Sequence, residues 1–155
     1  MGTQGISVEP GEGRSVRLRG TTVGFKVESD HAAGASLTEW EAVPGFDTGA
    51  HVHERLEETW YVLDGELEFR VGEETFTAAA GATVFVPPHV PHAFANRSDR
   101  PTRFLRILSP PGHDRYFDEL AGILAVDGPP DPHAIAELRR RYDTEQISSL
   151  TTVQT

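Results

Sequence analysis

Side chains that can bind a metal ion gather in two short segments of this chain. His51 and His53 alternate with Val52, so a β-strand through them would direct both imidazoles to the same face. Four residues separate His53 from Glu58 in the first segment, residues 45–65. His92 lies in the second segment, residues 81–96. Three imidazoles and one carboxylate suit a divalent first-row metal, and thiolate ligands are excluded because the chain has no cysteine. The sequence therefore predicts a metal site at these three histidines and Glu58.

The expected ligands leave room for chemistry at the metal. Four protein ligands around a six-coordinate metal leave two positions open. One carboxylate offsets only part of a divalent charge, so the centre should favour an enolate, phenolate or carboxylate as a further ligand. On residue type alone, Glu57 could supply the carboxylate as well as its neighbour Glu58.

The elements that must position these ligands are expected to be short strands. From Val16 to Leu108, runs of β-forming residues are broken by glycine and proline, and residues 66–71 alternate apolar with charged side chains. The dipeptide Asp64-Gly65 predicts a tight type I′ hairpin turn. Many short strands of this kind favour an all-β fold, an antiparallel double-sheet barrel or jelly roll. Inward residues of neighbouring strands converge in such a barrel, which would bring distant ligands together.

The pattern changes after residue 110. Tyr116, Phe117, Leu120 and Leu124 recur at helical spacing, and residues 134–142 repeat that spacing after a pair of prolines. We expect two short C-terminal helices packed outside a single barrel, because no internal repeat is visible. The predicted division of the chain is a flexible lead-in over 1–13, a barrel over 14–110, a helical extension over 111–143 and a flexible tail over 144–155.

The spacing of the glycines, prolines and ligands resembles the two sequence motifs of the cupin family. The first motif is matched by Gly45, His51, His53, Glu58 and Gly65. The second is matched by Gly81, Pro87, His92 and Asn96. The family spacing selects Glu58 over Glu57, because Glu58 alone leaves six residues before Gly65. The chain is thus similar to single-domain cupins of the quercetinase-like and polyketide-cyclase-like kind.

The resemblance implies a cupin barrel that holds one divalent metal, with Fe expected and Mn, Ni or Zn as alternatives. It implies a dioxygenase in which a small enol, phenol or diketone binds the metal and Glu58 acts as a base. A second possibility is a cyclase or isomerase of a polyketide-like or sugar-like substrate, with a redox-inert metal acting as a Lewis acid. A third is a cupin that binds a small molecule without turnover.

Strand alternation also suggests which residues line the substrate site. If Glu58 faces inward, Trp60 and Val62 share its direction, and Phe94 shares that of His92. We expect these three apolar residues to contact the substrate, although plain core packing explains aromatic residues equally well.

Several other polar residues have more than one interpretation. His89 replaces the glycine usual in the second motif and is expected to be an exposed turn residue rather than a fifth ligand. His113 precedes a predicted helix, which favours a capping or solvent-exposed role. Arg106 could anchor an anionic substrate if it faced inward, but strand alternation leaves its direction open. Asn96 is expected to satisfy backbone groups at a turn.

Composition limits the partners. The chain has 155 residues, enough for about one domain, with 14 Lys and Arg against 24 Asp and Glu and a net charge of -10. That charge repels phosphate backbones, so nucleic acid and anionic membranes are not expected partners. Glutamates at 66–68 and 73–74 flank turns and are interpreted as a solvated strand face. No signal peptide or membrane span is apparent, so we expect a cytoplasmic protein, and a homodimer because an exposed sheet edge needs covering.

Overall fold

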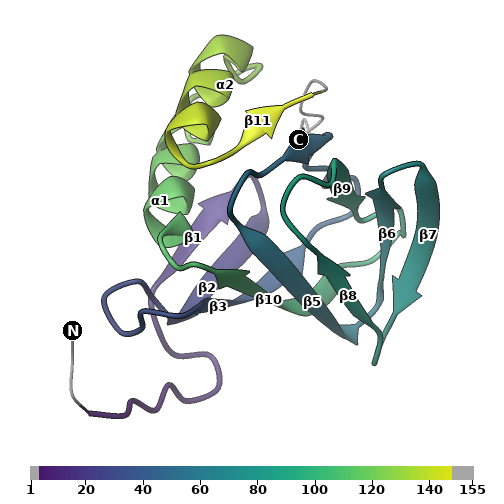
Figure 1. Cartoon of the computed structure of the whole chain (residues 1–155). Coiled ribbons are helices and arrows are strands. Elements are labelled where there is room, and N and C mark those ends of the chain that lie inside the picture. The colour runs from purple at the N-terminus through teal and green to yellow at the C-terminus, as the bar shows by residue number, and fades with distance from the viewer. Residues whose placement is uncertain (1–3, 148–155) are drawn as a thin grey trace.

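Two antiparallel sheets face each other in the computed structural model, which describes residues 4–147 (Figure 1). The six-stranded sheet has the order β1-β2-β3-β10-β5-β8, and the five-stranded sheet has the order β11-β4-β9-β6-β7. The strands are β1 Ser15–Leu18, β2 Thr21–Val27, β3 Ser36–Ala42, β4 His51–Val52, β5 Glu57–Asp64, β6 Glu66–Val71, β7 Glu74–Ala79, β8 Thr83–Val86, β9 His92–Ala95, β10 Thr102–Ser109 and β11 Glu145–Gln146. The predicted jelly roll is confirmed.

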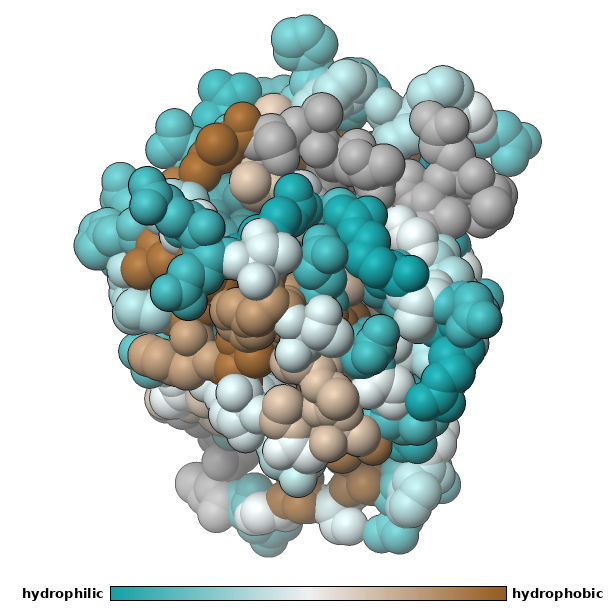
Figure 2. Space-filling model, turned by 90° about the vertical axis from the view of Figure 1, so that its right-hand side faces the viewer, coloured by the Kyte–Doolittle hydropathy of each residue, from teal (hydrophilic) through white to brown (hydrophobic). Residues whose placement is uncertain are grey.

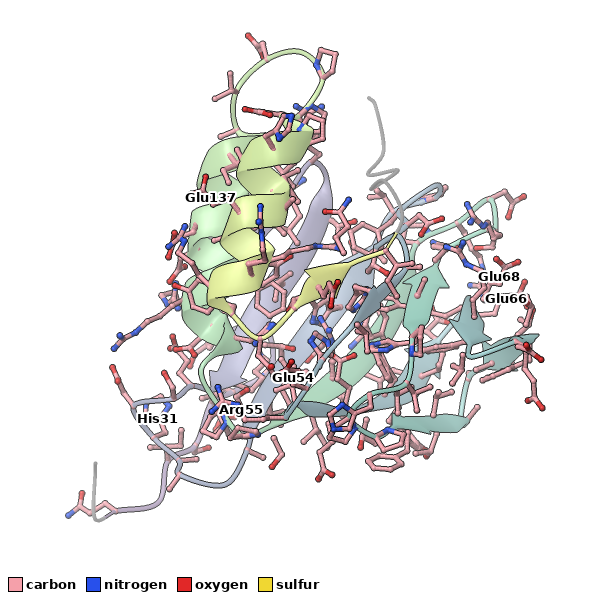
Figure 3. All side chains as sticks on the ribbon, turned by 45° about the horizontal axis from the view of Figure 1, so that its top comes forward. His31, Glu54, Arg55, Glu66, Glu68 and Glu137 are labelled. Atoms are coloured by element: carbon pink, nitrogen blue, oxygen red, sulfur yellow. The ribbon has the colours of Figure 1, made fainter. Side chains whose placement is uncertain are left out.

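Strict alternation of side chains builds the core between the sheets. Strand β10 buries Thr102, Phe104, Arg106 and Leu108 and turns the residues between them outward. The largest buried side chains are aromatic: Trp40, Trp60, Phe69, Phe94, Phe104 and Phe117. Glu66 and Glu68 lie on the side of the molecule away from the helices, as expected for a solvated strand face (Figure 3).

The turn predicted at Asp64-Gly65 is wrong. A type I′ turn requires positive φ at both residues, and only Gly65 has it, at 84°. Strand β5 belongs to the six-stranded sheet and β6 to the other, so the chain steps between sheets at this point. A Cβ on Gly65 would lie 2.7 Å from Oγ1 of Thr102, which explains why glycine is needed at the crossing.

Two helices follow the strands, as predicted. They are α1 (His113–Leu124) and α2 (Pro132–Arg141). Asp131 caps α2 by accepting a hydrogen bond from the backbone N–H of His133. The helices lie together at one end of the two sheets rather than merely outside them (Figure 1). No helix in the described range is long and apolar enough to cross a membrane.

The chain after α2 departs from the flexible tail predicted from residue 144. Strand β11 pairs with His51 and Val52 of β4, so ladder hydrogen bonds order a segment that has few apolar anchors. The remainder of the predicted tail, 148–155, lies outside the described residues, as do residues 1–3 of the predicted lead-in.

Candidate metal centre and its cavity

The structure brings the four predicted ligands together inside the jelly roll. His51 lies on β4 with His53 just beyond it, Glu58 lies on β5 and His92 on β9. His51 and His92 face each other across the β4–β9 pair, which fixes two ligands by backbone pairing alone. One candidate ligand atom from each of the four residues lies within 4.8 Å of the others, and all four side chains are buried.

Hydrogen bonds orient all three imidazoles in the same way. The Nδ1 atoms of His51, His53 and His92 lie 2.9, 2.8 and 2.9 Å from the backbone carbonyl oxygens of Gly49, Asp143 and Val90. A carbonyl oxygen can only accept, so each Nδ1 carries a hydrogen, which leaves Nε2 as the ring atom that could offer a lone pair to a metal. The imidazoles are therefore arranged as metal ligands usually are, with the second ring nitrogen held by an outer partner.

The atoms facing Glu58 fit a cation. Oε2 of Glu58 lies 2.8 Å from Nε2 of His92, and Oε1 lies 3.2 Å from Nε2 of His53. Two lone-pair atoms at such distances repel unless a proton or a metal ion lies between them. Nε2 of His53 is buried and makes no hydrogen bond with any of residues 4–147. A divalent metal would satisfy these nitrogen and oxygen donors together.

Arg106 keeps Glu58 ionised. Its guanidinium pairs with Oε1 of Glu58, and only 5% of Arg106 is exposed. Burial by itself would raise the pKa of Glu58, but Arg106 and the neighbouring imidazoles hold it well below the ordinary value. Burial, followed by the charge of His92, lowers the pKa of His51, so this imidazole stays neutral. Ionised carboxylate and neutral imidazole are the forms that bind metal.

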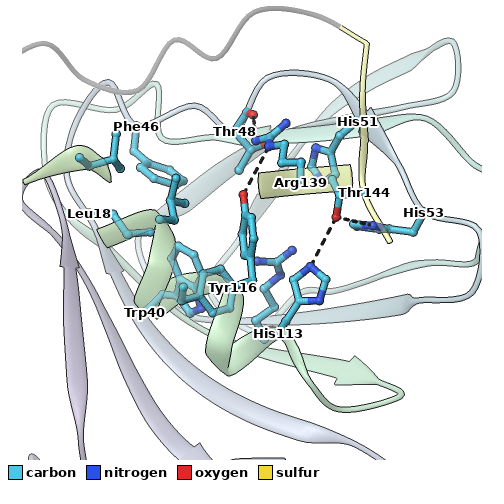
Figure 4. Close-up of a pocket in the computed structure, with 14 residues that line it drawn as sticks. Leu18, Trp40, Phe46, Thr48, His51, His53, His113, Tyr116, Arg139 and Thr144 are labelled. Carbon is cyan, nitrogen blue, oxygen red and sulfur yellow. Dashed lines mark hydrogen bonds between the residues drawn. The ribbon is translucent and has the colours of Figure 1, made fainter. Parts of the chain in front are cut away.

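A cavity opens beside this cluster (Figure 4). Its space for water-sized molecules is small, about 40 Å³. The polar lining comprises Thr48, His51, His53, Arg106, His113, Tyr116, Arg139 and Thr144, and the apolar lining comprises Leu18, Trp40, Phe46, Phe117, Leu120 and Leu124. Two of the metal ligands thus form part of a largely aromatic and aliphatic pocket.

Comparison with known proteins identifies the core of the molecule. A family model described as "Cupin domain" matches residues 38–108, from β3 to β10. This chain contains a cupin domain. The structure of KdgF from Halomonas sp. shares the fold with a TM-score of 0.65 and 18% identity, over 72% of this chain and 99% of that one.

Two curated relatives match part of this chain. The uncharacterized protein MJ1618 of Methanocaldococcus jannaschii is 33% identical over 76 residues, which is 49% of this chain and 61% of that protein. The polyketide synthase CurC of Streptomyces cyaneus is 36% identical over 67 residues, or 43% of this chain and 44% of CurC. The chain therefore spans less than two thirds of the length of either relative.

One wall of the cavity comes from outside the cupin domain. Helix α1 supplies His113 and Tyr116, helix α2 supplies Arg139, and the segment after α2 supplies Thr144. Oγ1 of Thr144 lies 3.2 Å from Nδ1 of His53 and 3.5 Å from Nε2 of His113. The extension therefore supplies part of the cavity lining and contacts a candidate ligand directly.

The predicted role of His113 is wrong. Gly112 is the N-cap residue of α1, and no side chain caps that helix. His113 is only 6% exposed and faces the cavity, and burial lowers its pKa to about 3. Its spacing to Tyr116, Phe117 and Leu120 places it on the apolar face of α1. The same rule applies to Arg139, which lies four residues after the buried Ile135, so helical spacing could have identified both residues.

The three apolar residues predicted to contact substrate are fully buried. Trp60, Val62 and Phe94 belong to the hydrophobic core, and none of them lines the cavity beside the metal ligands. The ring of Trp60 lies 5.9 Å from that of His92, so it packs against the imidazole of this candidate ligand. A contact of these residues with substrate stays a prediction.

The structure also tests the predictions for Glu57, His89 and Asn96. Glu57 is exposed while Glu58 is buried, as the motif spacing predicted. His89 is exposed with a φ of 68°, a conformation that favours glycine, which explains why glycine usually occupies this motif position. Nδ2 of Asn96 donates to the backbone oxygens of Ala42 and Arg100, which confirms its role in satisfying backbone groups.

Proposed function

We propose that this protein is a metal-dependent enzyme acting on a small organic anion, and specifically a dioxygenase of an enol, phenol or diketone. One observation carries the proposal: His51 and His53 are both candidate ligands and cavity-lining residues. A metal held by them would face a buried, mostly apolar space. Such a space suits oxygen chemistry on an organic substrate, because it keeps water away from reactive species.

His51, His53, Glu58 and His92 would hold the metal, for which we propose Fe(II). When bound, it would take the enolate or phenolate oxygen of the substrate and supply redox chemistry with O₂. The protein would supply the base and would hold it in position. Arg106 fixes Oε1 of Glu58, so Glu58 would hold the metal through Oε2 and would accept a hydroxyl proton from the substrate at that atom on leaving the metal briefly.

The positive charges around the cavity favour an anionic substrate. Arg106 lies 5.5 Å from the ring centres of Trp40 and Trp60 and 5.7 Å from that of Phe117. These aromatic faces stabilise the guanidinium and hold it in place at the cavity wall. Glu58 offsets the charge of Arg106, so the net positive charge that would stabilise a bound enolate comes from the divalent metal and from Arg139, which also lines the cavity.

A second candidate is a cyclase or isomerase in which a redox-inert metal polarises a carbonyl group. The similarity of the cupin domain to CurC, named as a polyketide synthase, favours this candidate. It requires no oxygen, so the two candidates differ in a simple measurement. Tight binding without turnover would support the third candidate, a non-catalytic binding protein.

The first experiment is metal analysis by elemental mass spectrometry on protein purified without a polyhistidine tag. We expect about one Fe, Mn or Ni ion per chain, lost in Glu58→Ala. Glu57→Ala is the matched control, because it removes a carboxylate from the neighbouring exposed position and should keep the metal. An absence of metal in the native chain even after reconstitution would contradict the proposal.

The second experiment follows oxygen consumption with a flavonol, a catechol and a β-diketone. Consumption by the metal-loaded protein, and its loss in Glu58→Ala, would support the dioxygenase. Turnover of a polyketide-like or sugar-like carbonyl compound under strict anaerobiosis would move the Lewis-acid cyclase or isomerase to first place.

A further inference from the structure

Arg139 is a buried cation for which residues 4–147 supply no counter-charge. It lies on α2, only 3% of it is exposed, and it lines the cavity beside His51 and His53. Within residues 4–147, seven other arginines form ion pairs with carboxylates, but none is found for Arg139. Its Nη1 atom is buried and has no hydrogen-bond partner in that range. A buried charge in this state is costly unless something compensates it.

The contacts that Arg139 does make account for only part of its guanidinium. Nη2 donates to the backbone oxygen of Thr48 at 2.7 Å, and Nε donates to the hydroxyl of Tyr116 at 3.3 Å (Figure 4). These bonds tie α2 to α1 and to the segment before β4. They use neither hydrogen of Nη1, so a tethering role leaves the outer edge of the group unexplained.

The charges around the cavity do not balance. Arg106 is neutralised by Glu58, whereas Arg139 has no carboxylate partner among the described residues. A divalent metal would add further positive charge. The cavity therefore calls for a ligand with negative charge at two places, one near the metal and one near Arg139.

We infer that Arg139 binds a carboxylate of the substrate whose other end reaches the metal centre. The inference rests on the proposed function for the metal end alone. A planar guanidinium with free N–H groups on one edge matches a carboxylate better than a neutral group. Trp40, Tyr116 and Phe117 beside it suit an aromatic or unsaturated body. The substrate class is thus a small aromatic or enolic acid, and Arg139 determines specificity for its acid group. Because the cavity has only about 40 Å³ of space in this structure, its lining side chains would have to move apart to admit the acid.

The test uses benzoate, with benzamide as a neutral probe of the same shape. Binding is measured by isothermal titration calorimetry on the full chain, both Zn-loaded and treated with EDTA. We expect the wild type to bind benzoate at least tenfold more tightly than benzamide, and Arg139→Gln to lose at least tenfold in benzoate affinity. Arg140→Gln is the matched control, because it removes the same charge from an adjacent exposed position of α2 and should bind like the wild type.

A measurement on the wild type keeps the inference testable if Arg139→Gln fails to fold. In ¹⁵N NMR spectra, benzoate should shift the Nε–H signal of Arg139 and benzamide should not, and Arg139→Lys should recover part of the affinity. An unshifted signal, or equal affinity for benzoate in Arg139→Gln and the wild type, would overturn the inference. Because EDTA-treated protein is included, benzoate binding that depends on Arg139 in the absence of metal would support this inference even if the metal analysis or the oxygen assay contradicted the proposed function.

Discussion

Nδ1 of His53 donates a 2.8 Å hydrogen bond to the backbone oxygen of Asp143, 90 residues further along the chain. The carboxylate of Asp143 accepts from the backbone N–H groups of Glu54, Arg55 and Leu56, which follow His53 directly. Asp143, which follows α2, therefore fixes both the ring of the candidate ligand His53 and the loop that leads from His53 to Glu58.

Asp143→Ala is expected to weaken the metal centre without touching a ligand. The change leaves three backbone N–H groups without their acceptor, at a cost of about 1–3 kcal/mol. The variant keeps the backbone oxygen that accepts from His53 but frees the loop after His53 from the carboxylate that anchors it, so this support should loosen and metal affinity should fall by roughly 10- to 100-fold. Competition with a fluorescent chelator measures the affinity, and Asp127→Ala, in an exposed loop, is the control. Equal affinity in both variants would show that the extension does not orient His53.

Arg106→Met is expected to destabilise the metal-free protein strongly. It leaves the carboxylate of Glu58 buried without its cation, and breaking a buried pair in this way costs about 3–5 kcal/mol. Arg103→Met is the control on the same strand, since its pair with Glu39 is exposed and worth about 0–1 kcal/mol. Urea unfolding in EDTA compares the two. Similar losses in both variants would mean that Arg106 does not compensate Glu58.

The metal-free protein is expected to lose stability as the pH falls below about 6.5. Burial lowers the pKa of His113 to about 3. As the pH falls below 6.5, the unfolded chain therefore binds a proton at His113 that the folded chain does not bind. Stability therefore rises with pH between about 3 and 6.5, and the contribution of His113 at pH 5 is a loss of about 2 kcal/mol. His113→Phe should remove that share of the slope in unfolding curves from pH 7.5 to 5. An unchanged slope would show that His113 is protonated in the folded protein.

We propose that a second copy of the chain covers the outer face of the six-stranded sheet. Tyr61, Phe85 and Ile107 are 43%, 53% and 40% exposed on β5, β8 and β10, and β8 forms the open edge of that sheet. Apolar groups also gather amid hydrophilic ones on the face shown in Figure 2. Light scattering should give two chains per particle and one for Phe85→Glu. A native monomer would contradict the proposal.

The sequence predicted the candidate ligands well because their arrangement is set by short-range spacing. His51 and His53 follow strand alternation, and the choice of Glu58 over Glu57 needed only the distance to Gly65. The direction of Arg106 was left open because its neighbours in sequence do not reveal which face of β10 is buried. The turn at Asp64-Gly65 failed for a different reason: positive φ at a glycine serves a hairpin and a crossing between sheets alike.

The cavity wall was harder to foresee because it depends on where the extension docks. Helical spacing shows that His113 and Arg139 lie on apolar faces, but it does not tell what those faces pack against. Short strand β11 depends on backbone pairing with β4, and its residues carry little apolar signal. Contacts over some 90 residues of sequence decide this part of the site.

The bond between His53 and Asp143 also sets an order of events during synthesis. The cupin domain leaves the ribosome before the extension, because chains are made from the N-terminus. At that stage the three candidate histidines and Glu58 have been made. The residue that accepts the hydrogen bond from Nδ1 of His53, and the helices that line the cavity, have not. The full support of the candidate metal centre would thus be in place only after residue 143 has been made and has docked, so we expect a nascent barrel to bind metal more weakly than the finished protein.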